Sequence, residues 1–169
     1  MNKMLLAAAA VALLAASGSS YAGQTTTKSQ IVGTWQVVRV KDVTGGGVSY
    51  PLGERPTGYV TVTPTRIWLM FVDSTRTPPA RAAQTDAEAV ASMKSHAAWT
   101  GRYVTANQTP DGVKVVAHVD SASNQALTGT DRVYLMRVDG NKLTMTSPGV
   151  IAPMTGKATA VEIDLVRAD

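Results

Sequence analysis

Hydrophobic and polar residues alternate in short runs along most of this chain, and residues typical of turns separate the runs. A period of two predicts β-strands that bury one face, and Gly, Pro, Asn and Asp between them predict tight connections. Eight strands are expected on this basis, at residues 31–41, 58–63, 66–72, 101–106, 113–120, 130–138, 141–147 and 157–167. All eight prolines fall outside these runs, which supports the boundaries because proline cannot donate a hydrogen bond within a sheet.

The connections indicate how the strands are arranged. Thr109-Pro110-Asp111-Gly112 and Asp139-Gly140 are both typical of hairpin turns. Sequential antiparallel strands with short turns favour an up-and-down barrel, because closure leaves no unpaired edge. A two-sheet sandwich is the alternative. We therefore expect an all-β, eight-stranded antiparallel barrel, whose interior has room for packed side chains or for one small ligand.

One short helix is expected between the third and fourth strands. Thr85-Asp86-Ala87-Glu88 has the pattern of a capping box, in which the threonine and the glutamate satisfy each other's backbone N–H groups. A weak apolar stripe follows and reaches residues 96–98; it consists of Ala87, Val90, Ala91 and Ala97. Because these residues are small, we expect the helix to lie close against the barrel as a lid or plug.

The first 22 residues have the pattern of a signal peptide. Lys3 precedes an unbroken apolar run at residues 4–16, and Ser20-Tyr21-Ala22 offers small residues at the positions that a signal peptidase reads. The run is shorter than the roughly 20 residues that span a bilayer, so we expect no stable membrane anchor; a retained anchor is the alternative. We expect a signal peptide at 1–22, a disordered lead-in at 23–30 and one barrel domain at 31–169. The mature protein is then periplasmic or secreted.

Composition narrows the classes of function. The chain has no cysteine, so it has no disulfide, thiol nucleophile or thiolate metal ligand. With two histidines and no cysteine, we expect no metal site and no cofactor. The net charge of +4 comes from lysines and arginines spread singly along the chain, without a basic run. We therefore expect no nucleic-acid partner.

The first and last strands carry a pattern typical of barrel closure. Gly33 and Trp35 are two residues apart and point to the same face, where the glycine leaves room for the indole to lie across the end of a closed β-structure. In the last strand, the apolar residues 161, 163 and 165 share a face with Arg167, which places this arginine inside. Stacking of Arg167 on Trp35 explains that placement. A role for Arg167 as the counter-charge of a ligand is the alternative.

Several motifs resemble, in order, the bacterial lipocalin-like domain family, a divergent branch of the lipocalin and calycin barrels. They are Ile31-Val32-Gly33-Thr34-Trp35, residues 56–64, Gly101-Arg102-Tyr103, His118-Val119, residues 129–133 and residues 139–145. Segments 75–84 and 147–156 depart from the pattern. The resemblance implies the barrel fold and a binding pocket, but no reaction. It also implies that Trp35 closes the floor of the barrel beneath Arg167.

Aromatic residues are the main candidates for the pocket, because flat apolar walls with hydroxyl or indole groups are typical of small-molecule cavities. The candidates are Tyr59, Trp68, Trp99, Tyr103 and Tyr134. Simple packing in the core is their alternative role. His118 is a further candidate at the rim. Strict alternation places it on the polar face of its strand, whereas a bulge after Gly112 would turn it inwards.

These observations predict a binding protein. The chain has no Gly-x-Ser-x-Gly, no phosphate-binding glycine loop and no His-Glu-x-x-His motif. We expect an exported barrel that binds or carries a small, mainly apolar molecule. A barrel enzyme of the isomerase or cyclase kind is one alternative. An envelope interaction or inhibitor protein that uses its loops is the other, and a filled interior would favour it.

Overall fold

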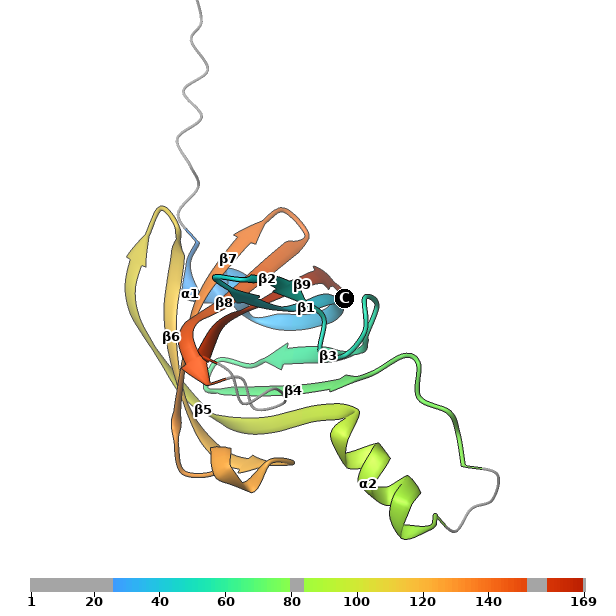
Figure 1. Cartoon of the computed structure of the whole chain (residues 1–169). Coiled ribbons are helices and arrows are strands. Elements are labelled where there is room, and N and C mark those ends of the chain that lie inside the picture. The colour runs from blue at the N-terminus through green and yellow to red at the C-terminus, as the bar shows by residue number, and fades with distance from the viewer. Residues whose placement is uncertain (1–25, 80–83, 152–157, 169) are drawn as a thin grey trace, which may run out of the picture.

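The strands form one antiparallel sheet that closes on itself, as the computed structural model shows (Figure 1). The structure describes residues 26–79, 84–151 and 158–168. In these residues eight strands follow one another around the barrel: β1 (Gly33–Thr44), β3 (Thr57–Val62), β4 (Arg66–Val72), β5 (His96–Thr109), β6 (Gly112–Ala122), β7 (Asp131–Asp139), β8 (Lys142–Ile151) and β9 (Ala158–Arg167). Pairing of β1 with both β3 and β9 closes the sheet. The predicted eight-stranded up-and-down barrel is confirmed.

A ninth, short strand extends the end of β1. Strand β2 (Gly47–Ser49) forms a hairpin with β1, in which Asp42 pairs with Ser49 and Thr44 pairs with Gly47. All three of its residues are exposed. A strand of three exposed residues has no buried face, so the alternation of the sequence could not reveal it.

Strands β5 and β8 extend beyond the bounds that the sequence predicted. Strand β5 begins at His96 instead of residue 101, because the residues expected to end the helix pair with β4. Strand β8 continues through Pro148 to Ile151, so this proline lies inside a strand. The pairing with β9 shifts register between Ser147 and Val150. A bulge tolerates proline because the ladder is already interrupted there.

The helix α2 (Asp86–Lys94) lies between β4 and β5, as predicted, but it does not pack as a plug. Its capping box is present: the Thr85 backbone N–H donates to Glu88 Oε2 over 2.7 Å, and the Glu88 N–H donates to Thr85 Oγ1 over 3.3 Å. None of its residues is buried, and Val90 and Met93 are more than half exposed. The expected close packing is therefore wrong. Figure 1 shows α2 beside one end of the barrel.

The opposite end of the barrel is covered by the short helix α1 (Lys28–Ile31). Ile31, the last residue of α1, and Thr26, two residues before the helix, are buried. Thr26 Oγ1 accepts a hydrogen bond from the Val138 N–H over 3.0 Å. Residues 26–30 are thus ordered, in contrast to the disordered lead-in that the sequence predicted. The expected signal peptide and residues 23–25 lie outside the described residues.

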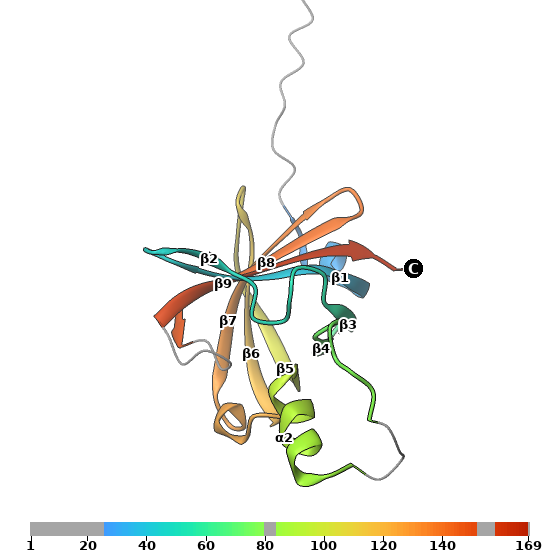
Figure 2. The same cartoon turned by 45° about the vertical axis from the view of Figure 1, so that its right-hand side comes forward.

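The interior is filled at the α1 end. The buried side chains there come from the inward faces of the strands and include Trp35, Val60, Val62, Ile67, Tyr103, Val113, Val115, Met136, Leu143, Met145 and Leu165. The turns β3–β4, β5–β6 and β7–β8 all lie at this end, because consecutive strands are antiparallel. The other end carries α2, the β2–β3 connection and the 3-10 helix η1 (Gln125–Leu127) between β6 and β7. Figure 2 shows α2 and the β6–β7 connection at this end.

Candidate ligand-binding cavity

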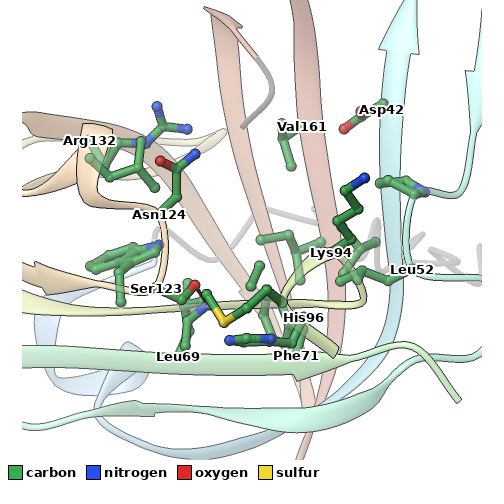
Figure 3. Close-up of a pocket in the computed structure, with 18 of the residues that line it drawn as sticks. Asp42, Leu52, Leu69, Phe71, Lys94, His96, Ser123, Asn124, Arg132 and Val161 are labelled. Carbon is green, nitrogen blue, oxygen red and sulfur yellow. Dashed lines mark hydrogen bonds between the residues drawn. The ribbon is translucent and has the colours of Figure 1, made fainter. Parts of the chain in front are cut away.

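A cavity of about 660 Å³ occupies the end of the barrel that carries α2 and η1 (Figure 3). Its walls are side chains from β1, β4, β5, β7 and β9. Its rim comes from the β2–β3 connection, the end of α2 and the β6–β7 connection. Pockets that hold small molecules typically measure about 300–1,000 Å³. The cavity is therefore large enough for a ligand of that kind.

Most of the wall is apolar. Aliphatic and aromatic side chains line it, among them Val40, Leu52, Leu69, Phe71, Ala97, Leu127, Val161 and Ile163. Two predicted site residues, Trp99 and Tyr134, also line it. Their rings stack at 13° with centroids 6.0 Å apart, so together they present one broad aromatic surface.

Besides Tyr134, four ionisable side chains line the cavity: Asp42, Lys94, His96 and Arg132. Asp42, on β1, is 4% exposed. Lys94 is exposed at the rim, on the last turn of α2. His96 Nδ1 lies 2.9 Å from the Ser92 carbonyl oxygen, a contact that joins the start of β5 to α2. Arg132 lies on β7 two residues before Tyr134, so both point to the same face.

Arg132 is partly buried and lies beside the Tyr134 hydroxyl. Its Nε is inaccessible to solvent and has no hydrogen-bond partner. Among the described residues, no Asp or Glu oxygen lies within 4.0 Å of its guanidinium. Nearby polar groups are already engaged: Ser123 Oγ accepts from the Ala98 N–H, and Asn124 Oδ1 accepts from the Ala126 N–H, each over 3.1 Å. Arg132 thus lines the cavity as a cation without an ion-pair partner among the described residues.

The Tyr134 hydroxyl stays protonated at neutral pH. Burial raises its pKa above the usual value of 10.0, because the charged phenolate would lose its hydration; Arg132 and Trp99 beside it act in the opposite direction. The group can therefore donate a hydrogen bond to a ligand oxygen.

Trp35 and Arg167 lie together at the filled end. Trp35 is fully buried, and the Arg167 guanidinium lies 4.0 Å from the centre of its ring. The Trp35 Nε1–H donates to the Ile31 carbonyl over 2.9 Å, and Arg167 donates to the Gln30 carbonyl over 2.9 Å. Gly33 lies two residues before Trp35 at the start of β1. This group ties α1 to the barrel floor.

Tyr103 belongs to the same filled end and does not line the cavity. It is 6% exposed, its hydroxyl donates to the Thr63 carbonyl over 2.9 Å, and Lys28 Nζ lies 5.3 Å from its ring centre. Burial raises the pKa of Tyr103 above its usual value.

Three other predicted site residues lie on the outer face of the barrel. Tyr59 and Trp68 are 44% and 41% exposed, because their neighbours Val60 and Leu69 take the inward positions. His118 is exposed, and its Nδ1 lies 2.9 Å from Asp131 Oδ1. The strict alternation of β6 therefore holds at His118.

The sequence analysis missed Asp42 and Arg132. Asp42 and Trp35 are an odd number of residues apart, so Asp42 would face outwards on a regular strand on which Trp35 faces inwards. The pairing of β1 with β9 shifts register between Val37 and Arg39, and this irregularity turns Asp42 inwards. Arg132 could have been found, because it lies two residues before the candidate Tyr134 on one strand.

An antiparallel barrel that is filled at one end and hollow at the other belongs to the class of β-barrels that enclose one small ligand. The chain belongs to the lipocalin-like domain family, whose model matches residues 32–166. No curated protein and no solved structure matches the chain. The lipocalin-like barrel is in general a fold of binding proteins.

Two further kinds of feature are absent from the described residues. No group of three or more His, Asp and Glu side chains lies close enough together to hold a metal ion. No helix in the same part of the chain combines the length and apolar character needed to cross a membrane.

Proposed function

We propose that this protein binds or carries a small, mainly apolar molecule in the cavity formed by β1, β4, β5, β7 and β9. The observation that carries the proposal is the cavity itself: about 660 Å³, lined mostly by apolar and aromatic side chains, with a few polar groups. Apolar walls provide the affinity, and a few polar groups fix the orientation of the ligand. The membership of the lipocalin-like domain family supports the same function.

An uncharged fluorescent probe, N-phenyl-1-naphthylamine, tests this proposal. It should bind the mature protein in the micromolar range, about −8 kcal/mol. The substitution Ala97→Trp places a large side chain in the cavity wall and should weaken binding at least about tenfold. The matched control is Ala106→Trp on the same strand, at an exposed position away from the cavity. No binding to the unmodified protein, or equal binding to both variants, would contradict the proposal.

We also propose that the protein is exported from the cytoplasm. Its support is the pattern of residues 1–22, with Lys3, an apolar run and Ser20-Tyr21-Ala22. Expression of the full chain in a bacterial host should yield a mature protein that begins at Gly23 and is released with the periplasm or the medium. Amino-terminal sequencing of the fractions checks this. Recovery of a cytosolic protein that retains residues 1–22 would overturn it.

A further inference from the structure

We propose that the molecule held in the cavity is an amphiphile, with an apolar body and a carboxylate head that binds Arg132. The inference rests on the proposed function, because it assigns the ligand class of the same cavity. It is carried by the lack of an ion-pair partner for Arg132 among the described residues, the distribution of charge around the cavity and the stacked rings beside the arginine.

The first step is the missing partner of Arg132. Charged side chains in protein interiors are normally paired, because removing a charge from water is costly. Three buried side-chain atoms of the described residues lack a hydrogen-bond partner: Thr128 Oγ1, Arg132 Nε and Ser147 Oγ. Arg132 is the charged one, and it is also the one of the three that lines the cavity. A guanidinium that lines the cavity without an ion-pair partner among the described residues marks a place where an anionic ligand oxygen would be stabilised.

The second step is the distribution of charge. Two of the lining side chains, Arg132 and Lys94, are cationic, and Asp42 is the single carboxylate among the lining residues. Asp42 takes part in interactions of its own. Figure 3 shows Asp42 across the view from Arg132, with Asn124 beside the arginine. An anionic head is therefore favoured on the Arg132 side of the cavity.

The third step is chemical fit. A guanidinium presents its N–H donors in a planar fork, which matches the two oxygens of a carboxylate. Tyr134 is two residues along the same face and offers a protonated hydroxyl as a further donor. The stacked rings of Trp99 and Tyr134 lie beside the proposed head and continue into the aliphatic wall. One region of the cavity thus suits a polar head and the rest suits an apolar chain.

Three ten-carbon ligands that differ in the head group test the proposal. Calorimetric titration at pH 8 would measure the affinity of the mature protein for decanoate, 1-decanol and decyltrimethylammonium, all below their aggregation concentrations. A hydrogen bond to a charged group is typically strong enough to change affinity by a factor of ten or more. Decanoate should therefore bind at least about tenfold tighter than 1-decanol, and the cation should bind most weakly.

Variants then assign the preference to Arg132. In Arg132→Gln the advantage of decanoate over 1-decanol should disappear, because decanoate loses affinity by the larger factor, and 1-decanol and N-phenyl-1-naphthylamine should still bind. These uncharged ligands also report that the variant is folded. Arg132→Lys keeps the charge without the fork and should retain part of the preference. The matched control is Arg102→Gln, an exposed arginine on β5, which should behave as the unmodified protein does.

Each failure has a separate meaning. Equal affinity for decanoate and 1-decanol, a decanoate preference that survives Arg132→Gln, or tightest binding of the cation would overturn the carboxylate proposal. The binding function would stand in all three cases. Absence of binding by all three ligands and by the uncharged probe would overturn both proposals.

Discussion

Trp35 is the residue through which the barrel floor is assembled. Its ring is fully buried, its Nε1–H binds the Ile31 carbonyl, and Arg167 lies on its face. One side chain thus connects β1 to α1 and, through Arg167, to β9. Arg167 in turn donates to the carbonyls of Gln30 and Val32, so the floor is held by both packing and hydrogen bonds.

Removal of this side chain should be costly. We expect Trp35→Ala to lower the free energy of unfolding by about 3–5 kcal/mol, the range for deletion of a packed large aromatic. Urea denaturation followed by circular dichroism measures the change. Trp68→Ala is the control, because Trp68 is 41% exposed on the outer face and should contribute less than about 1 kcal/mol. Similar losses in the two variants would contradict the assignment of Trp35 to the floor.

Lys41 stabilises the seam between β1 and β9 through ion pairs. It pairs across the β1–β9 seam with Glu162, and its Nζ lies 2.9 Å from Asp164 Oδ2. Hydrogen bonds to Glu162 and then to Asp164 raise the pKa of Lys41 above its usual value of 10.5. A raised pKa in the folded protein means that the stabilisation is present below about pH 10.5 and is lost as the pH rises through the raised value.

The variant Lys41→Met isolates this contribution. At pH 8 it should be less stable than the unmodified protein by up to about 1 kcal/mol, because the ion pairs are only partly buried. The difference should shrink as the pH rises above the pKa of Lys41 in the folded protein. Chemical denaturation at pH 8, 10 and 11.5 checks this. A difference that stays constant across the series would show that the lysine acts through packing of its aliphatic stem.

At the scale of elements, the contact between β5 and β6 depends on Gly101. The register of β5 with β6 shifts between Thr100 and Gly101, and the backbones of the two strands come very close there. A Cβ atom on residue 101 would lie 2.0 Å from the His118 carbonyl oxygen. Because that oxygen belongs to the backbone, a side chain at residue 101 would force the two strands apart.

We therefore expect Gly101→Ala to destabilise the protein by about 1–3 kcal/mol, as overpacked substitutions do. The measurement is again the free energy of unfolding. Gly45→Ala is the matched control, since a Cβ there has no atom within 4 Å and the residue has no positive φ. A neutral effect of Gly101→Ala would mean that β5 and β6 separate at this point without cost.

The elements also show what the alternation could and could not predict. It predicted the inward positions of Trp35 and Arg167, because their strands keep a regular period of two near the floor. It could not orient Trp68, because β4 is apolar on both faces and residues 67–72 offer no polar side to mark solvent. It would place Asp42 on the outer face, because the irregular pairing in β1 that turns this residue inwards has no signature in composition. The prediction that α2 packs closely against the barrel was wrong for a related reason, since small residues fit a buried or an exposed helix equally well.

At the scale of the whole molecule, we expect Arg132 to favour ligand binding and to lower the stability of the ligand-free protein. Partial burial of a charge that lacks an ion-pair partner is destabilising, and an apolar replacement of similar size is often neutral or stabilising. We expect Arg132→Met to raise the free energy of unfolding of the ligand-free protein by up to about 1 kcal/mol, because the arginine is only partly buried. Arg102→Met, at an exposed position, should change it by less than about 0.5 kcal/mol. A destabilised Arg132→Met would show that the arginine has a structural partner.

The unmodified protein and Arg132→Met should also differ in how much a ligand stabilises them. Decanoate at a hundred times its dissociation constant should stabilise the unmodified protein by about 2.7 kcal/mol. At that concentration Arg132→Met should gain much less. Thermal unfolding with and without decanoate measures both shifts, and equal shifts would contradict the role of Arg132 in binding.

The division of the barrel into a filled and a hollow end also fixes how the molecule can be attached to something else. Thr26 is packed against β7 and the Ala168 N–H donates to the Thr34 carbonyl over 2.9 Å, so the chain enters and leaves at the filled end. A tag, a fusion partner or a solid support joined to either side is therefore placed on the far side of the molecule from the cavity. The mouth stays accessible in a sensor or an affinity resin built from this chain, without any redesign of its loops.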